Sequence, residues 1–319
     1  NPYYWRGTPK LQKIVFKPTP DDNTMVAALQ TGDIDLWPLL PVPFYAHVND
    51  LRGVSALHQP SYGFQHLDFN VTRPAVSDPI VRHALRLAID RAEVRAKLNH
   101  GLGVLQEGVI SPVNPVGYDP AIPFEKFDPA RANALLDADG WKRGADGVRA
   151  KNGVRLSLLF ASSAGTPATD SMIELIRSWW RQIGVEVTRK DYPSSLLFGT
   201  AQDGGILSTG KYDVGQFAWY LGPGGDLSGI YECSQRPPKG QNSVFWCDPT
   251  ADAAMRDFKL TYDLNRERRD DAIVQEEIAK EVPTIVLFVR EDVYAYNADL
   301  KGFHPNDVSP FDDMMNVDL

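Results

Sequence analysis

The stretch VRLSLLFA at residues 154–161 is followed by a short SSAGT loop, a helical pattern from Pro167 to Ile183, and VEVTRKD at residues 185–191. Thr166 is a typical helix-capping residue, and Gly184 is a typical helix stop. These patterns predict a strand, a helix and a second strand. Such crossovers join parallel strands and are right-handed, and small ligands bind at the carboxyl ends of these strands. We therefore expect an α/β fold with a ligand-facing loop at residues 162–166.

The overall composition is that of an acidic globular protein. The chain has 319 residues, 33 basic and 41 acidic side chains, a net charge of −8 and 43% hydrophobic residues, which excludes intrinsic disorder. It has no run rich in lysine and arginine, so it is not expected to bind nucleic acid, which requires concentrated positive charge. Apolar runs such as residues 285–289 are far shorter than the roughly 20 residues that cross a bilayer.

The patterns that flank the central unit indicate two lobes, which suits a chain of this length. The first part predicts strands at 11–16, 34–37 and 62–70, a helix that ends at Gly32, and a long helix that begins after Ser77. The later part predicts a helix after Asp128, a strand at 212–220, helices at 250–263 and 266–281, and a strand at 282–289.

Residues 101–127 are rich in glycine and proline and lose periodicity, which is typical of a crossing between lobes. We place the lobe boundary near Leu105. Residues 1–105 are then part of lobe I, residues 106–289 form an α/β lobe II, and residues 290–319 return to complete lobe I. The crossings near Leu105 and Val289 are the expected hinge.

Five segments share their residues and their order with one protein family. They are NPYYW at 1–5, ALQTGDID at 28–35, the helix from Asp78 to Arg91 with its V-R-x-A-L and A-I-D-R groups, A-L-L followed by G-W at 134–141, and K-G-F at 301–303. The chain thereby resembles the extracellular solute-binding proteins of ABC importers, family 5, which include oligopeptide, dipeptide and nickel-binding types. Members are longer, so the chain resembles their carboxyl-terminal portion, without the export signal, one small domain and part of a lobe.

The resemblance implies a two-lobe periplasmic-binding-protein-like fold, type II and similar to cluster C, with its amino-terminal part missing. It implies a periplasmic or extracellular protein, with a lipid anchor as an option, that binds a solute reversibly and delivers it to a membrane permease. The solute is expected to be a peptide or another small polar molecule. We expect a monomer without a cofactor.

Cys233 and Cys247 bracket a loop rich in glycine and proline, with no histidine nearby. A zinc site requires more ligands. Some family members carry a similar C-x-n-P-P-x-G-x-N-x-n-C loop, so we expect a disulfide, which forms in oxidising compartments. Two reduced, buried thiols are the alternative.

The candidate ligand residues lie at predicted strand ends. Ser162, Ser163 and Thr166 line the strand-to-helix loop, whose free N–H groups can receive a carbonyl or an anion. Trp219 and Tyr220 precede a glycine-rich loop at the place where the family has a ligand-facing W-x-x-D turn. Comparison with the family adds Gln216, Tyr192 and Asn242. Tyr62, an aromatic residue on a first-lobe strand, is a further candidate. Plain packing is the alternative for the aromatic residues.

Gly222 stands where the family's W-x-x-D turn has an aspartate. The resemblance implies that, in peptide binders, this aspartate pairs with the amino terminus of the ligand. Zwitterionic peptides therefore fit only if Asp226 substitutes for that aspartate.

Other chemistries find little support. The chain contains neither a G-x-S-x-G nucleophile motif nor a glycine-rich loop ending in Lys-Ser/Thr, and its six histidines lack metal-ligand spacing. Acid pairs such as Asp33 and Asp35 are explained by turn and cap roles, although a secreted hydrolase with an acid pair is one alternative function. A ligand-sensing regulatory domain is another.

Overall fold

A computed structural model describes residues 3–164, 167–306 and 308–319. By contacts the chain divides into two compact units: a small unit of residues 1–61 and 290–319, and a large unit of residues 62–289. The chain therefore passes between units after Ser61 and again after Val289. None of the described helices is long and apolar enough to cross a membrane.

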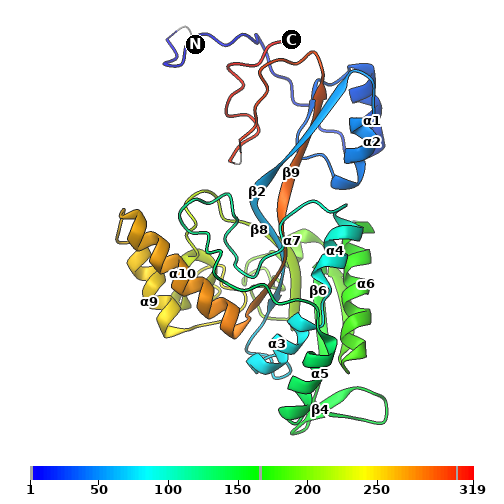
Figure 1. The fold of residues 1–319 in the computed structure, drawn as a ribbon, viewed down its shortest axis with the longest axis vertical. Helices are drawn as coiled ribbons and strands as arrows, with labels where there is room; N and C mark the ends of the chain where they lie inside the picture. Colours follow the sequence, from blue (N-terminus) through cyan, green and yellow to red (C-terminus); the bar gives the residue numbers. More distant parts are fainter. Residues whose placement is uncertain (1–2, 165–166, 307) are drawn as a thin grey trace. The chain divides into compact units, whose positions relative to one another are not determined.

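The small unit contains short elements and the outer parts of two long strands, β2 and β9 (Figure 1). Its own elements are α1 (Asp22–Thr31), β1 (Leu36–Trp37), the 3-10 helix η1 (Val42–Phe44) and α2 (Tyr45–Asn49). As the sequence predicts, α1 ends at Gly32, which takes the left-handed conformation that glycine adopts without a Cβ clash. β1 pairs antiparallel with β9, and a small core forms around Tyr294, Leu300 and Phe303.

The predicted strand at Leu11–Phe16 is wrong. The segment forms no strand in the part of the chain that the structure describes. Its apolar residues Ile14, Val15 and Phe16 are 46%, 57% and 70% exposed. A strand is stabilised by pairing with a neighbour and by burial of one face, and this segment lacks both.

The large unit is built on a mixed sheet with the strand order β9-β2-β8-β6-β7. β6 runs parallel to both β7 and β8, while β2 is antiparallel to β8. The predicted crossover from β6 through α6 to β7 is therefore confirmed. The bounds of these strands are β2 (Val54–Phe69), β6 (Ser157–Ser163), β7 (Glu186–Tyr192), β8 (Val214–Tyr220) and β9 (Thr284–Asn297).

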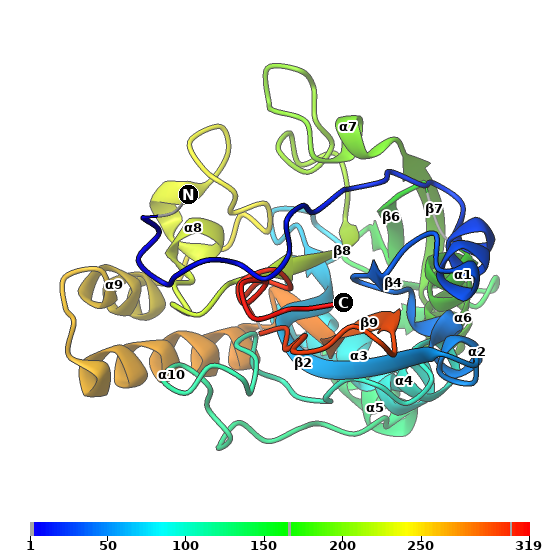
Figure 2. The same ribbon diagram turned by 90° about the horizontal axis from the view of Figure 1, so that it is seen from above.

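Helices cover one face of this sheet (Figures 1 and 2). Side chains from four helices pack with strand residues such as Leu67, Phe69 and Phe160 in the main core. We call this the helix-covered face. The helices on this side are α3 (Pro79–Leu87), α4 (Arg91–Leu98), α5 (Pro129–Ala138) and α6 (Pro167–Gln182).

The predicted long helix after Ser77 is two helices. Asp78 caps α3, which ends before Ala88, and Asp90 caps α4 by accepting the N–H of Glu93 at 2.9 Å. Asp90 competes for backbone N–H groups and starts a new helix instead of extending the old one.

The opposite face carries Phe64, Ala161 and Phe217. Phe64 packs with helical residues such as Met255 and Val274, whereas mostly irregular chain surrounds Ala161 and Phe217. We call it the loop-covered face. Its elements are α7 (Ser194–Leu197), α8 (Ser228–Tyr231) and the 3-10 helix η2 (Cys233–Gln235). The long helix α10 (Leu264–Glu281) lies beside α9 (Pro249–Phe258), as Figures 1 and 2 show. A separate hairpin-like sheet contains β3 (Lys142–Arg143), β4 (Arg149–Lys151) and β5 (Val154–Arg155).

The expected lobe boundary near Leu105 falls inside the large unit. The first division comes between Ser61 and Tyr62, because residues 62–105 supply the inner part of β2 and the helices α3 and α4 that pack on α5 and α6. Residues 290–319 group with residues 1–61. How these units correspond to lobes of a longer protein stays a prediction.

Candidate functional site

The carboxyl ends of β6 and β7 meet at one edge of the large unit's sheet. Ser163 is paired with Tyr192 in parallel register, and the N–H of Ala164 donates to the carbonyl of Tyr192 at 2.8 Å. β8 ends at Tyr220 on the same edge, because it runs parallel to β6. This is the edge at which ligands bind in open α/β sheets.

The alternation of side chains separates the predicted residues into two groups. Register places Ser163, Tyr192 and Trp219 on the loop-covered face, together with Phe217. The other group, on the helix-covered face, is Ser162, Gln216 and Tyr220. The predicted residues share one edge of the sheet but do not form a single surface.

Aromatic rings form a connected series on the loop-covered face. The ring centres of Trp219 and Phe217 are 5.8 Å apart, and those of Phe217 and Phe198 are 5.5 Å apart. His66 packs on Phe217 at 4.4 Å, with Phe64 behind it at 5.0 Å. The series runs from fully buried Phe64 to Phe198, which is 53% exposed. Edge-to-face contacts of this kind hold the rings in fixed positions.

Tyr192 and Trp219 both pack against one apolar cluster, and they differ in exposure. Tyr192 is only 6% exposed, and the ammonium of Lys190 lies 5.1 Å from its ring centre. Trp219 is half-buried and also touches the second core of the unit. Trp219 therefore retains surface that a ligand could cover, whereas Tyr192 acts mainly as support.

Phe198 and Phe217 are not among the candidate residues that the sequence predicts. Phe198 follows the four-residue helix α7 in a segment without clear periodicity, so no sequence pattern relates it to Trp219. Phe217 was recognisable, because alternation along β8 puts it on the same face as Trp219.

The hydroxyl of Ser162 is already engaged. It donates to Oδ1 of Asp191 at 2.6 Å, and Nε of Arg189 donates to the same oxygen at 2.8 Å. Burial raises the pKa of Asp191, but the hydrogen bonds from Ser162 and Arg189 outweigh it and leave the pKa below its ordinary value. Ser162 thus holds the carboxylate of Asp191 in place, and its hydroxyl proton is engaged in that hydrogen bond.

Gln216 and Tyr62 are nearly buried, at 3% and 8% exposure. Tyr220 is 47% exposed at the end of β8, opposite Gly63 of β2. Thr166 lies outside the described residues.

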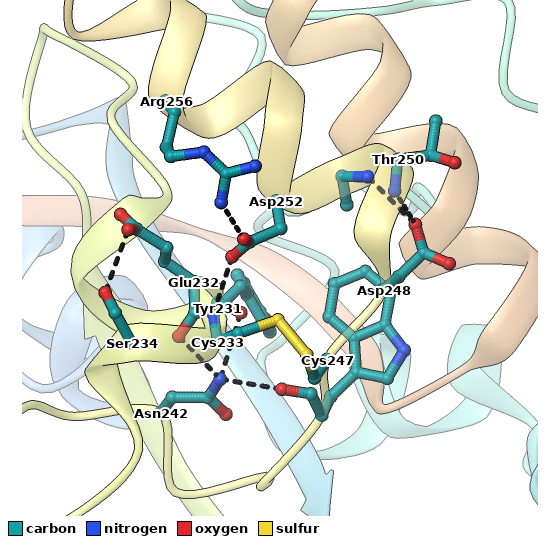
Figure 3. Close-up of a disulfide and its surroundings, with 12 residues drawn as sticks. Tyr231, Glu232, Cys233, Ser234, Asn242, Cys247, Asp248, Thr250, Asp252 and Arg256 are labelled. Carbon is teal, nitrogen blue, oxygen red and sulfur yellow. Dashed lines mark hydrogen bonds and ion pairs between the residues drawn. A yellow bond between two sulfur atoms is a disulfide. The ribbon is translucent and has the colours of Figure 1, made fainter.

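The expected disulfide between Cys233 and Cys247 is confirmed (Figure 3). Its loop is fastened to α9, since Oδ1 of Asp252 accepts the N–H of Cys233 at 2.8 Å and Asp248 caps the helix.

The side chain of Asn242 is fully buried inside the disulfide loop. Nδ2 donates to the carbonyls of Tyr231, Glu232 and Trp246 at 2.9, 3.0 and 2.9 Å (Figure 3). These carbonyls come from both arms of the loop, so the amide ties the arms together. Its donors are therefore consumed by the protein, and the G-x-N position has a structural role here.

The loop that follows β8 carries Asp226. This residue is exposed, and its Oδ1 accepts the N–H of Ser228 at 2.8 Å. Asn114 supports the same loop by donating from Nδ2 to the carbonyl of Pro223 at 3.1 Å. The acid is therefore held in place while part of its carboxylate faces solvent.

A surface hollow of about 520 Å³ lies elsewhere in the large unit. Its charged lining is Arg143, Asp146, Glu174, Arg177, Arg181 and Glu186. Because it lies beside the start of β7, it is at the opposite end of the parallel strands from the candidate site. Among the described residues, no group of three or more histidine, cysteine or acidic side chains is arranged to hold a metal ion.

The chain is similar to one large group of known proteins. Residues 1–240 match the family model described as bacterial extracellular solute-binding proteins, family 5 middle. The oligopeptide-binding protein AppA of Bacillus subtilis is 25% identical over 312 residues, covering 96% of this chain and 56% of AppA. The glutathione-binding protein GsiB of Salmonella typhimurium is 27% identical over 323 residues, covering 98% of this chain and 59% of GsiB.

Solved structures show the same fold. AppA of Bacillus subtilis in complex with a nonapeptide aligns with a TM-score of 0.85 at 23% identity, covering all of this chain and 62% of AppA. NikA of Brucella suis in complex with Fe(III)-EDTA aligns with a TM-score of 0.84 at 20% identity, covering 99% of this chain and 63% of NikA. The chain thus spans little more than half the length of these relatives.

Proposed function

This chain belongs to the bacterial extracellular solute-binding proteins of family 5, which are not enzymes, and from this premise we propose that it is the solute-binding part of an ABC importer. The full-length protein holds a peptide-like or other small polar solute between two lobes and presents it to a permease in the membrane. No covalent bond changes. Solute contacts that only the closed form makes shift the population toward that form.

The observation that best supports this proposal is the aromatic series at the sheet edge. Trp219 and Phe198 are partly exposed, and each packs on Phe217. Because Phe217 already holds both rings in place, solute binding does not have to order them. Rigid, partly exposed rings supply apolar contact area at low entropic cost, which is what a reversible binder requires.

The solute class is inferred from the relatives and from one acid. Relatives are named as oligopeptide-binding and glutathione-binding proteins. In this chain Gly222 occupies the place of the family's loop aspartate, and Asp226 is exposed four residues later in the same loop. We assign Asp226 as the partner of a solute amino group, which makes a peptide-like solute the expected class.

The proposed location follows from the family and the disulfide. The family is extracellular, and a disulfide persists in an oxidising compartment. We therefore propose a periplasmic or cell-surface protein that works as a monomer beside its permease.

The proposal is tested by native mass spectrometry of the full-length protein purified under gentle conditions. A co-purified small molecule is expected, and its mass identifies the solute. Solution scattering with that solute at saturation should show a more compact particle. An unchanged scattering profile contradicts closure, and chemical turnover of the solute points to a hydrolase instead.

A further inference from the structure

Asp271 is an acidic residue buried where acids are rarely found. It lies on α10, is 3% exposed, and faces the segment of residues 108–118 and the loop of residues 221–226. Its Oδ2 is enclosed and finds no hydrogen-bond partner among the described residues. A buried carboxylate without a partner is costly, so such a group favours its neutral form.

Two glycines make room for this carboxyl group. A Cβ atom placed on Gly117 would collide with Oδ2 of Asp271, and one placed on Gly225 would lie 3.2 Å from it. Cδ1 of Ile110 lies in the same contact, 2.9 Å from the Gly117 Cβ position. Oδ2 of Asp271 therefore packs against the backbone at Gly117 and Gly225 and is out of contact with solvent.

Hydrogen bonds hold the two segments around Asp271. Gln275, one turn further along α10, donates from Nε2 to the carbonyl of Gly117 at 2.7 Å and accepts the N–H of Ile110 at 3.2 Å. Asn114 accepts the N–H of Gly117 at 2.8 Å and donates to the carbonyl of Pro223 at 3.1 Å. Asp271 thus lies between an anchored segment and the loop that follows Trp219 and Tyr220.

The charges that act on Asp271 are negative. Burial, followed by the charges of Asp226, Glu267 and Asp270, raises the pKa of its carboxyl group to about 8. Asp226 is on the facing loop, while Glu267 and Asp270 are on α10. Among the arginines of α10, Arg266 pairs with Asp257 at 2.6 Å, Arg268 donates to the carbonyl of Pro115 in the facing segment at 3.5 Å, and Arg269 acts on Asp270.

We propose that Asp271 is a pH-sensitive latch: when protonated, it lets the loop of residues 222–226 pack against residues 110–117, and when ionised, it loosens that contact. Ionisation puts a charge into the space lined by Gly117 and Gly225, and it repels Asp226 on the loop. The loop begins directly after the candidate ligand residues of β8, so its packing determines how firmly the end of that strand is held.

The test is a carboxyl-carbon and amide NMR titration of the full chain from about pH 6 to about pH 10, which spans the expected ionisation. We expect the carboxyl group of Asp271 to titrate near pH 8, and the amides of Gly117 and Gly225 to shift with the same midpoint. In Asp271→Asn these shifts should vanish, because the amide stays neutral throughout. Asp226→Asn should keep the transition but lower its midpoint.

Glu276→Gln is the matched control, because Glu276 is an exposed acid on the same helix and the midpoint should not move. A carboxyl group of Asp271 that is already ionised at pH 6 and does not titrate up to pH 10 overturns the proposal. So does a transition near pH 8 that leaves both glycine amides unmoved. If Asp271→Asn fails to fold, Asp226→Asn still decides, because an unchanged midpoint contradicts the repulsion across the contact.

Discussion

The ring of Tyr220 lies directly against Gly63 on the neighbouring strand. A Cβ atom added to Gly63 would be 2.8 Å from Cζ and 2.9 Å from Cε2 of Tyr220, which is too close for any real contact. The backbone of Gly63 is not in the left-handed region, so a side chain there is opposed by the Tyr220 ring, which would have to move. The absence of a side chain at one position in β2 thus sets the position of an exposed ring at the end of β8.

This relationship predicts the outcome of a double-mutant cycle. Gly63→Ala should destabilise the chain by about 1 kcal/mol or more, because the ring must move. In a Tyr220→Ala background the same change should be neutral or stabilising, since alanine loses less backbone entropy than glycine. Urea unfolding of the four chains measures the coupling. Equal costs of Gly63→Ala in both backgrounds would show that the ring does not depend on the glycine.

Trp219→Ala should weaken solute binding by about tenfold or more, because it removes a large, partly exposed ring from the candidate site. Isothermal titration calorimetry with the co-purified solute measures the change. Tyr262→Ala is the matched control, since Tyr262 is fully exposed on the connection between α9 and α10. If Trp219→Ala binds the solute as tightly as the Tyr262→Ala control does, Trp219 is not part of the binding site.

Asn242→Ala should lower the free energy of unfolding by about 3 kcal/mol, because three buried carbonyls lose their donor. Solute affinity, measured under conditions where the variant is folded, should change little. Gln241→Ala is the control, as Gln241 is the exposed neighbour in the same loop. A large loss of affinity without a loss of stability would restore the ligand role that the family comparison suggests.

Removal of the disulfide should also cost stability. The two cysteines are 14 residues apart, and closing a loop of this size stabilises a protein by roughly 3 kcal/mol in the chain-entropy model. Thermal unfolding with and without reductant should show the difference, and Cys233→Ser/Cys247→Ser should match the reduced protein. Free thiols in the protein purified without reductant would contradict the bond itself.

Asp271 gives the chain a specific dependence of stability on pH. Its pKa rises from the ordinary value of 3.8 to about 8 on folding, so the folded state retains a proton that the unfolded state has lost. The resulting stability is fully present below the unfolded pKa and is lost as pH rises through the folded pKa, by up to about 1.4 kcal/mol per pH unit. Asp271→Asn removes this loss.

We therefore expect Asp271→Asn to be more stable than the wild type at neutral pH. The difference in unfolding free energy should widen up to about pH 8 and stay constant above it. Urea unfolding at several pH values measures this difference, and subtracting the two chains cancels the other titrating groups. Parallel curves for the two proteins would show that Asp271 is already ionised in the folded state.

Most of the secondary structure was predictable because its signals are local. Capping residues such as Asp21 and Asp128, stops such as Gly32 and Gly184, and the alternation along β8 each act within a few residues. The break between α3 and α4 was missed because the apolar stripe continues through Ile89 while Asp90 starts a new helix. The strand at residues 11–16 was wrong because pairing depends on a partner that local sequence does not reveal.

The sequence by itself determined the family and the crossover from β6 to β7, because these depend on residue order and short-range pattern, and it predicted the cysteine pairing with reduced thiols as the alternative. Only the tertiary structure decided which face of the sheet each candidate residue occupies. It also showed that the amide of Asn242 donates to backbone carbonyls and that Phe198 packs with Phe217 and, through it, with Trp219. It also revealed Asp271, whose unusual pKa arises from glycines and acids that are distant in sequence. Burial and electrostatic environment are sums over neighbours from many segments, and folding alone brings those segments together.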